Sequence, residues 1–271
     1  MWHLALETIG LSGSVALFKD TQLVADSLLP AGIGSARSLL PTLHQMVQRA
    51  SLLPRDLELI SLAHGPGSFT GLRVSVATAK TIGYAIDIPI CAVDTLETLA
   101  YRLACQPLGD NNSQPRWIAV AMDAYRKQVF RLIARVEFQP NHCSSSPGSL
   151  DLQIPLGSQT LEAALWSQNP FYGWSCNSEA KFGGILPPTA GSADRYSVIV
   201  GGNAVQRYPL AADVVSAAHL IEPGDISAID VGHYAWRRWL AEDRVDPFHL
   251  LPNYLRASAA EEKASSTKDT L

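Results

Sequence analysis

The first hundred residues alternate between short apolar runs and longer segments of helical period. Residues 2–7, 14–19 and 21–29 are apolar runs separated by glycine, serine and a Lys-Asp-Thr-Gln turn, which predicts three consecutive antiparallel strands. Apolar residues then recur every three or four positions over 35–50, as in an amphipathic helix. Strands are expected next over 57–63 and 89–93, and helices over 71–85 and 95–105. This order is typical of a layered α/β unit.

The second half of the chain begins as the first half does. Residues 117–122 and 128–136 predict another strand pair, and this weak internal echo indicates two related lobes. The remaining expected elements are a loop over 138–155, a helix over 158–168, an irregular segment over 171–195, a strand over 197–202 and a helix over 230–242.

These elements predict a two-lobed chain with short additions. We expect the polar segment over 106–115 to be the linker between the lobes. The expected divisions are a first lobe over 1–105, a second lobe over 106–229 with an irregular insertion over 138–195, a helix and tail over 230–256 that pack back on the lobes, and a disordered tail over 257–271.

Composition and charge remove several classes of function. The formal net charge is −4 and no run of Lys or Arg stands out, so we expect a partner to supply most contacts to any nucleic acid. The four cysteines contain no C-x-x-C pair, and no two histidines lie three or four apart, which gives no metal site. The start of the chain is no signal peptide and no apolar stretch approaches about 20 residues, so we expect a soluble, cytoplasmic protein without a membrane anchor.

The most informative stretch is a glycine-rich corner between an expected strand and the helix over 71–85. Such a density of turn residues lets the backbone set the shape of the corner, and Ser68 or Thr70 can cap the helix. The free N–H groups of a first helical turn favour an anion, but a tight strand-to-helix turn explains the same pattern. The candidate anion or nucleotide contacts are Gly65, Gly67, Ser68, Thr70 and Arg73.

The helix after this corner carries small residues at every fourth position. Gly71, Ser75, Ala79 and Gly83 share one face, which Thr78 and Ile82 widen, so another helix can approach closely. The face fits a partner-binding surface, and it fits packing on the protein's own helix over 35–50 or its own sheet equally well.

The sequence allows two interpretations for each of three charged residues. Arg73 lies in a first helical turn, where a bound anion would stabilise it, and solvent or an ion pair with Asp94 or Glu97 is the simpler alternative. Glu7 ends the first strand and fits either a phosphate-contacting hairpin or one exposed acid, which we favour. Asp123 ends another strand, where an active-site acid and a turn former are both common. Walker, G-x-S-x-G and H-E-x-x-H motifs are absent.

With these residues in hand, the chain resembles the TsaB (YeaZ) family. The resemblance rests on the opening hairpin, on the whole corner from His64 to Val74, and on Pro89–Leu99. It continues through Val120–Phe130 and returns at Pro252–Arg256, whereas residues 138–229 show little of it. The resemblance implies a two-lobed, actin-like fold of the ASKHA (ribonuclease H-like) superfamily, in which each lobe is a mixed sheet with flanking helices.

The resemblance also implies a function. Members of the family partner a paralogue, TsaD, in making N6-threonylcarbamoyladenosine (t6A) in tRNA, and an ATPase, TsaE, docks on the pair. TsaD carries the metal and the chemistry, and the small-residue helix of TsaB lies in the dimer contact. Thr95 and Leu99 stand where TsaD has its two histidine ligands, and neither side chain replaces an imidazole.

We therefore expect a non-catalytic scaffold subunit of the t6A complex. It would contact TsaD and a TsaE-type ATPase, meet tRNA indirectly, and hold no cofactor of its own, with ATP or ADP bound only at a shared interface. Two alternatives stay open: a nucleotide-dependent phosphotransferase or ATPase of the same superfamily, and an M22-type metallopeptidase, as an older label of the family suggests. A homodimer of the isolated chain also stays open.

Overall fold

The computed structural model divides the chain into two units, each with its own sheet. It describes residues 1–10, 12–30, 32–106, 116–138, 150–168, 170, 197–210, 219–221 and 225–256. The first unit comprises Met1–Thr95 and Ile226–Leu271, and the second comprises Leu96–Asp225. Among the described residues, no helix combines the length and apolar character needed to cross a membrane.

The sheet of the first unit has five strands in the order β3-β2-β1-β4-β5. β1 pairs antiparallel with β2, and β2 with β3, whereas β1, β4 and β5 run parallel. Residues of β1, β2 and β4 are buried almost throughout, as expected of strands covered on both faces. The strands are β1 (Trp2–Glu7), β2 (Ser14–Lys19), β3 (Gln22–Leu28), β4 (Leu59–Gly65) and β5 (Ile90–Asp94).

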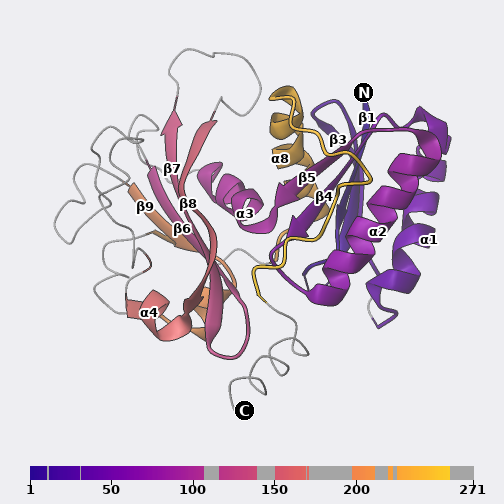
Figure 1. Cartoon of the computed structure of the whole chain (residues 1–271). Coiled ribbons are helices and arrows are strands. Elements are labelled where there is room, and N and C mark those ends of the chain that lie inside the picture. Colours follow the sequence, from indigo (N-terminus) through magenta and orange to yellow (C-terminus); the bar gives the residue numbers. More distant parts are fainter. Residues whose placement is uncertain are drawn as a thin grey trace. The chain divides into compact units, whose positions relative to one another are not determined.

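Helices cover both faces of this sheet (Figure 1). α1 (Ser35–Arg49) and α2 (Phe69–Ile86) pack on one face, with Leu17 of β2 in the core beneath them. α8 (Ala228–Leu240) packs on the other face, where Phe18 points. Neighbouring strand residues alternate between the two faces, which gives each helix layer its own set of side chains.

The sheet of the second unit repeats the same plan. Its order is β10-β9-β6-β7-β8, with β6, β7 and β8 antiparallel and β6, β9 and β10 parallel. The shared strand order and directions confirm an α/β fold of two related sheets. The strands are β6 (Arg116–Asp123), β7 (Gln128–Phe138), β8 (Leu150–Glu162), β9 (Ser197–Gly201) and β10 (His219–Ile221).

Short helices complete the described chain. They are the 3-10 helix η1 (Pro54–Asp56) and the helices α3 (Thr95–Ala104), α4 (Ala163–Gln168) and α6 (Ala204–Arg207).

The loop over 138–155 and the helix over 158–168 were wrong where the structure describes them. Strand β8 occupies Leu150–Glu162, and only Ala163–Gln168 is helical. The sequence from Leu150 to Leu156 alternates apolar and polar residues, a strand pattern that the serine, proline and glycine nearby outweighed. Pro155 fits there because β8 is an edge strand, where a missing N–H costs little.

The unit boundaries differ from the expected lobe boundaries at one helix. All but the first residue of α3 belongs to the second unit, whereas the sequence assigned residues up to 105 to the first lobe. α8 packs on the first sheet. Residues 107–115 of the expected linker over 106–115, most of the expected insertion over 138–195 and the expected tail over 257–271 lie outside the described residues.

Candidate functional site: the glycine-rich corner and helix α2

Each glycine of the corner lies against another part of the first unit. A Cβ added to Gly65 would lie 2.4 Å from the Asn253 carbonyl oxygen, and one added to Gly67 would lie 2.0 Å from Ile9 Cγ2. At Gly71 the added atom would lie 2.0 Å from the Thr8 carbonyl oxygen. Only glycine permits such approaches, so the corner is closely packed by its own chain.

Hydrogen bonds hold the same segments in place. The Asn253 N–H donates to the His64 carbonyl at 2.7 Å, and the Thr8 hydroxyl donates to the Gly71 carbonyl at 2.7 Å. The turn after β1 and the segment after α8 are therefore both hydrogen-bonded to the corner. This geometry supports the tight-turn interpretation for Gly65, Gly67 and Gly71.

Ser68 caps α2, as predicted. The Gly71 N–H donates to the Ser68 hydroxyl at 3.4 Å, and Ser68 and Thr70 are both exposed beside the first turn. An anion bound by these two residues stays a prediction, but Gly65 is buried and cannot take part without a change in packing.

The small-residue stripe of α2 faces its own sheet, which corrects the expectation that it faces a partner. Ser75 and Ala79 are fully buried, and Gly71 and Gly83 are buried as well. A Cβ on Gly83 would lie 3.0 Å from Ile90 Cδ1 of β5. The spacing identified a close-packing face, but the surface opposite is β4 and β5 of the same unit. Of the two residues that widen the stripe, Thr78 and Ile82, both are half-buried.

The opposite side of α2 is exposed and lies beside the segment after α8. Tyr84 and Phe248 are each 70% exposed, and their rings meet edge to face at 5.5 Å. The Lys80 ammonium donates to the carbonyls of Phe248 at 3.3 Å and Leu250 at 3.2 Å. Leu250 itself is buried in the core under α1 and α2. The segment is thus fastened along α2.

Arg73 also contacts this segment, and its contact with an anion, or an ion pair with Asp94 or Glu97, stays a prediction. Its Nε donates to the Tyr254 hydroxyl at 3.0 Å, and the Tyr254 ring stacks on Phe69 at 4.9 Å. In the sequence, Tyr254 is marked only by its place in the segment Pro252–Arg256 that resembles the family's tail. The aromatic and amide residues of 253–254 were its one visible signal.

Glu7 is fully buried, so the interpretation as an exposed acid was wrong. Its carboxylate accepts hydrogen bonds from the backbone N–H groups of Ile9 and Gly10, and the Gly10 bond is 2.8 Å long. The acid therefore fixes the turn after β1. A pocket of about 250 Å³ lies beside this turn, lined by Thr8, Gly10, Ser12, Gly13, Leu29, Pro30, Gly32, Gly34 and Ser35.

The two positions compared with metal ligands are core residues. Thr95 is fully buried, and Leu99 is 2% exposed. Within the part of the chain that the structure describes, no three His, Cys, Asp or Glu residues are arranged to hold a metal ion.

Asp123 in the second unit acts as a turn former. Its Oδ1 accepts from the Tyr125 N–H at 2.8 Å, and its Oδ2 pairs with the Arg207 guanidinium at 2.6 Å. Tyr208 donates its hydroxyl to Oδ1 at 3.3 Å. Of the two interpretations of Asp123, an active-site acid or a turn former, the structure supports the turn former.

Comparison with known proteins gives sequence matches to part of the chain. The family model described as TsaD, tRNA N6-adenosine threonylcarbamoyltransferase, matches residues 31–140. The tRNA threonylcarbamoyladenosine biosynthesis protein TsaB of Bacillus subtilis is 36% identical over 37% of this chain and 44% of its own length. The protein of that name from Escherichia coli is 29% identical over 47% of this chain and 52% of its own length. The chain thus spans about half the length of these relatives.

Structural comparison extends the likeness to nearly the whole chain. A Pseudomonas aeruginosa protein described as similar to peptidase YeaZ superposes with a TM-score of 0.65 at 21% identity, covering 94% of this chain and 99% of that one. A second structure, YeaZ from Pseudomonas aeruginosa, gives a TM-score of 0.62 at 20% identity, with the same coverage. At this identity the likeness establishes a shared fold.

Proposed function

We propose that this chain is an accessory subunit in the biosynthesis of tRNA threonylcarbamoyladenosine. The premise is its similarity to the TsaB (YeaZ) family in the comparisons above. In this role it binds a TsaD-like catalytic subunit and supports the transfer without carrying it out. The observation that carries the proposal is the 36% identity to a TsaB protein over 100 residues.

The outward face of α1 and α2 is the proposed docking surface. The small-residue face of α2 is buried against its own sheet, so a partner would contact the other side of the helix. Arg73, Ala77 and Tyr84 are exposed along that side at helical spacing. α1 adds the exposed Leu40 and His44 to the same surface, because the two helices pack next to each other. A standard interface buries roughly 1,600 Å² in total, which a pair of helices can supply.

The test is substitution on this outward face followed by co-purification with the TsaD-like protein of the same organism. Ala77→Arg places a long cation on the exposed side of α2, where it does not disturb the buried core. We expect it to abolish co-elution in gel filtration. Leu240→Arg is the matched control, since Leu240 is 67% exposed on α8, which packs on the other face of the sheet. Unchanged complex formation by Ala77→Arg would falsify the docking surface.

The proposal includes that this subunit has no catalytic activity of its own. Its support is the apolar and hydroxyl character of Leu99 and Thr95, together with a Glu7 carboxylate that is tied to the backbone of its own turn. Any ATP or ADP would sit at an interface shared with the partner, and a TsaE-type ATPase would dock on the pair in the cytoplasm. Calorimetry of the isolated chain with ATP and magnesium tests this, because tight binding with turnover would favour an ATPase instead.

A further inference from the structure

The turn between β6 and β7 displays three consecutive side chains to solvent. Tyr125, Arg126 and Lys127 have φ values of 59°, 52° and 61°, a left-handed conformation that residues other than glycine seldom adopt. All three are exposed, whereas the preceding Ala124 is buried. Because the backbone here is left-handed for three residues, the turn carries one aromatic and two cationic side chains at its tip.

Hydrogen bonds fix this turn. The Gln128 N–H donates to the Tyr125 carbonyl at 3.0 Å, and the Ala163 N–H donates to the Lys127 carbonyl at 2.9 Å. Asp123 accepts from the Tyr125 N–H at 2.8 Å. The display of the three side chains is therefore built into the second unit and needs no ligand to form.

Arg207 and Tyr208 extend the cationic and aromatic character. The guanidinium of Arg207 lies 5.5 Å from the centre of the Tyr125 ring and 5.8 Å from the Tyr208 ring. Its ion pair with Asp123 holds it there. An arginine between two tyrosines orients the Tyr125 ring, which is still 60% exposed.

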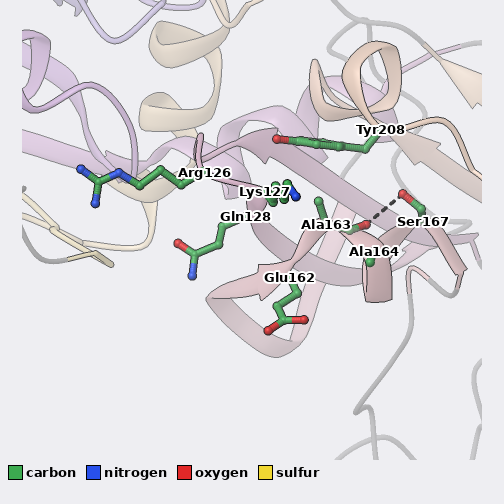
Figure 2. A pocket seen from close by; sticks show the side chains of 8 residues that line it. All are labelled: Arg126, Lys127, Gln128, Glu162, Ala163, Ala164, Ser167 and Tyr208. Carbon is green, nitrogen blue, oxygen red and sulfur yellow. Dashed lines mark hydrogen bonds between the residues drawn. The ribbon is translucent and has the colours of Figure 1, made fainter. Parts of the chain in front are cut away.

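A pocket of about 610 Å³ adjoins the turn (Figure 2). Figure 2 shows Tyr208 along one side, Gln128 and Glu162 along another, and Lys127 between them. Of the residues that line this pocket, Arg126 and Lys127 are cations and Glu162 is a carboxylate, although the whole chain carries a net charge of −4. The pocket is lined by Arg126, Lys127, Gln128, Glu162, Ala163, Ala164, Ser167 and Tyr208.

We propose that this cluster, Tyr125, Arg126, Lys127, Arg207 and Tyr208, is a contact site for single-stranded RNA. Lys127 and Arg126 would meet backbone phosphates, and an unpaired base would stack on Tyr125. A free polyphosphate or an acidic protein segment would use the cations alone, whereas an unpaired base can also stack on the part of the Tyr125 ring that Arg207 leaves exposed. The inference rests on the proposed function, to which it adds a direct contact between this subunit and its RNA substrate.

The test measures RNA binding by the full chain with fluorescence anisotropy. The probe is a labelled single-stranded RNA of about 12 nucleotides, with a duplex of equal phosphate content for comparison, at about 50 mM salt. We expect the single strand to bind more tightly than the duplex. Tyr125→Ala should weaken binding about tenfold, whereas Tyr125→Phe should stay within about twofold, because it keeps the stacking face.

Charge variants test the phosphate contact. Lys127→Gln should weaken binding about tenfold and lower the slope of log affinity against log salt by about 0.7, and Lys127→Arg should retain most of the affinity. Lys19→Gln, a substitution in the first unit, is the control. Circular dichroism establishes that every variant is folded before it is compared.

Two results would overturn the proposal: no RNA binding by the unaltered chain, or equal binding by Tyr125→Ala and Lys127→Gln. Binding of a polyglutamate peptide in place of RNA would also overturn it and would assign the surface to an acidic protein segment. Co-purification with the TsaD-like partner is measured in parallel. Because that assay reports on α1 and α2, failure of the proposed function and failure of the RNA contact give different results.

Discussion

His3 is a fully buried histidine in the middle of the first sheet. Its Nε2 lies 2.6 Å from the Ser61 hydroxyl, and its ring stacks on Phe18 at 5.5 Å. Burial, with a smaller contribution from the nearby His233, lowers the pKa of His3 to about 3. The folded protein therefore keeps this ring neutral at any pH above that value.

We predict that this histidine makes the protein less stable in acid. The unfolded chain takes up a proton on His3 below its ordinary pKa of about 6.5, and the folded chain does not, so stability falls as the pH drops from there toward 3. Between about pH 7.5 and pH 5 the expected loss is about 2 kcal/mol. Urea unfolding at both pH values measures it. His3→Asn should remove most of the difference, and an unchanged difference would contradict the assignment to His3.

Gly71 and Gly83 lie on one face of α2 and differ in what surrounds them. A methyl group at Gly71 would overlap the Thr8 backbone at 2.0 Å, whereas one at Gly83 would first meet the flexible end of Ile90 at 3.0 Å. We predict that Gly71→Ala costs about 3 kcal/mol or more of unfolding free energy. Gly83→Ala should cost less than about 1 kcal/mol, because alanine favours a helix interior. Equal costs in chemical denaturation would argue against the close approach at Thr8.

At the scale of elements, the segment after α8 is held by one deeply buried side chain next to an exposed one. Leu250 is 2% exposed and belongs to the core under α1 and α2, and Leu251 is 69% exposed. We predict that Leu250→Ala costs about 2–5 kcal/mol. It should also speed amide exchange at Asn253, whose N–H bonds to His64. Leu251→Ala should stay within about 0.5 kcal/mol, and a similar loss in both variants would show that the segment is not anchored as described.

Elements with a strong period could be predicted from the sequence, and weakly patterned ones could not. The stripes of α1, α2 and α8 and the apolar runs of β1, β2 and β4 specify their own conformation through the side chains that they bury. β10 has three residues and α6 has four, too few for any period to show. The spacing of Gly71, Ser75, Ala79 and Gly83 identified a face, but which surface packs against it depends on residues far away in the sequence.

On the scale of the molecule, the two sheets share one strand order although their sequences share little. The echo between residues 2–19 and 117–136 was visible because both segments are long hairpin strands. The corner itself was also visible as a cluster of glycines. Its contacts with Asn253 and Tyr254 were not, because they join positions about 180 residues apart, and no local pattern encodes such a pairing.

The first unit is assembled from both ends of the chain, with the second unit inserted between Thr95 and Ile226. A ribosome therefore releases the whole of the second unit before α8 and the segment around Asn253 can reach the corner at Gly65. Nascent domains usually fold in the order of their synthesis. Here the unit whose synthesis begins first would be completed after the second unit, so any factor that recognises the closed corner would distinguish chains that already contain the segment around Asn253 from chains that do not.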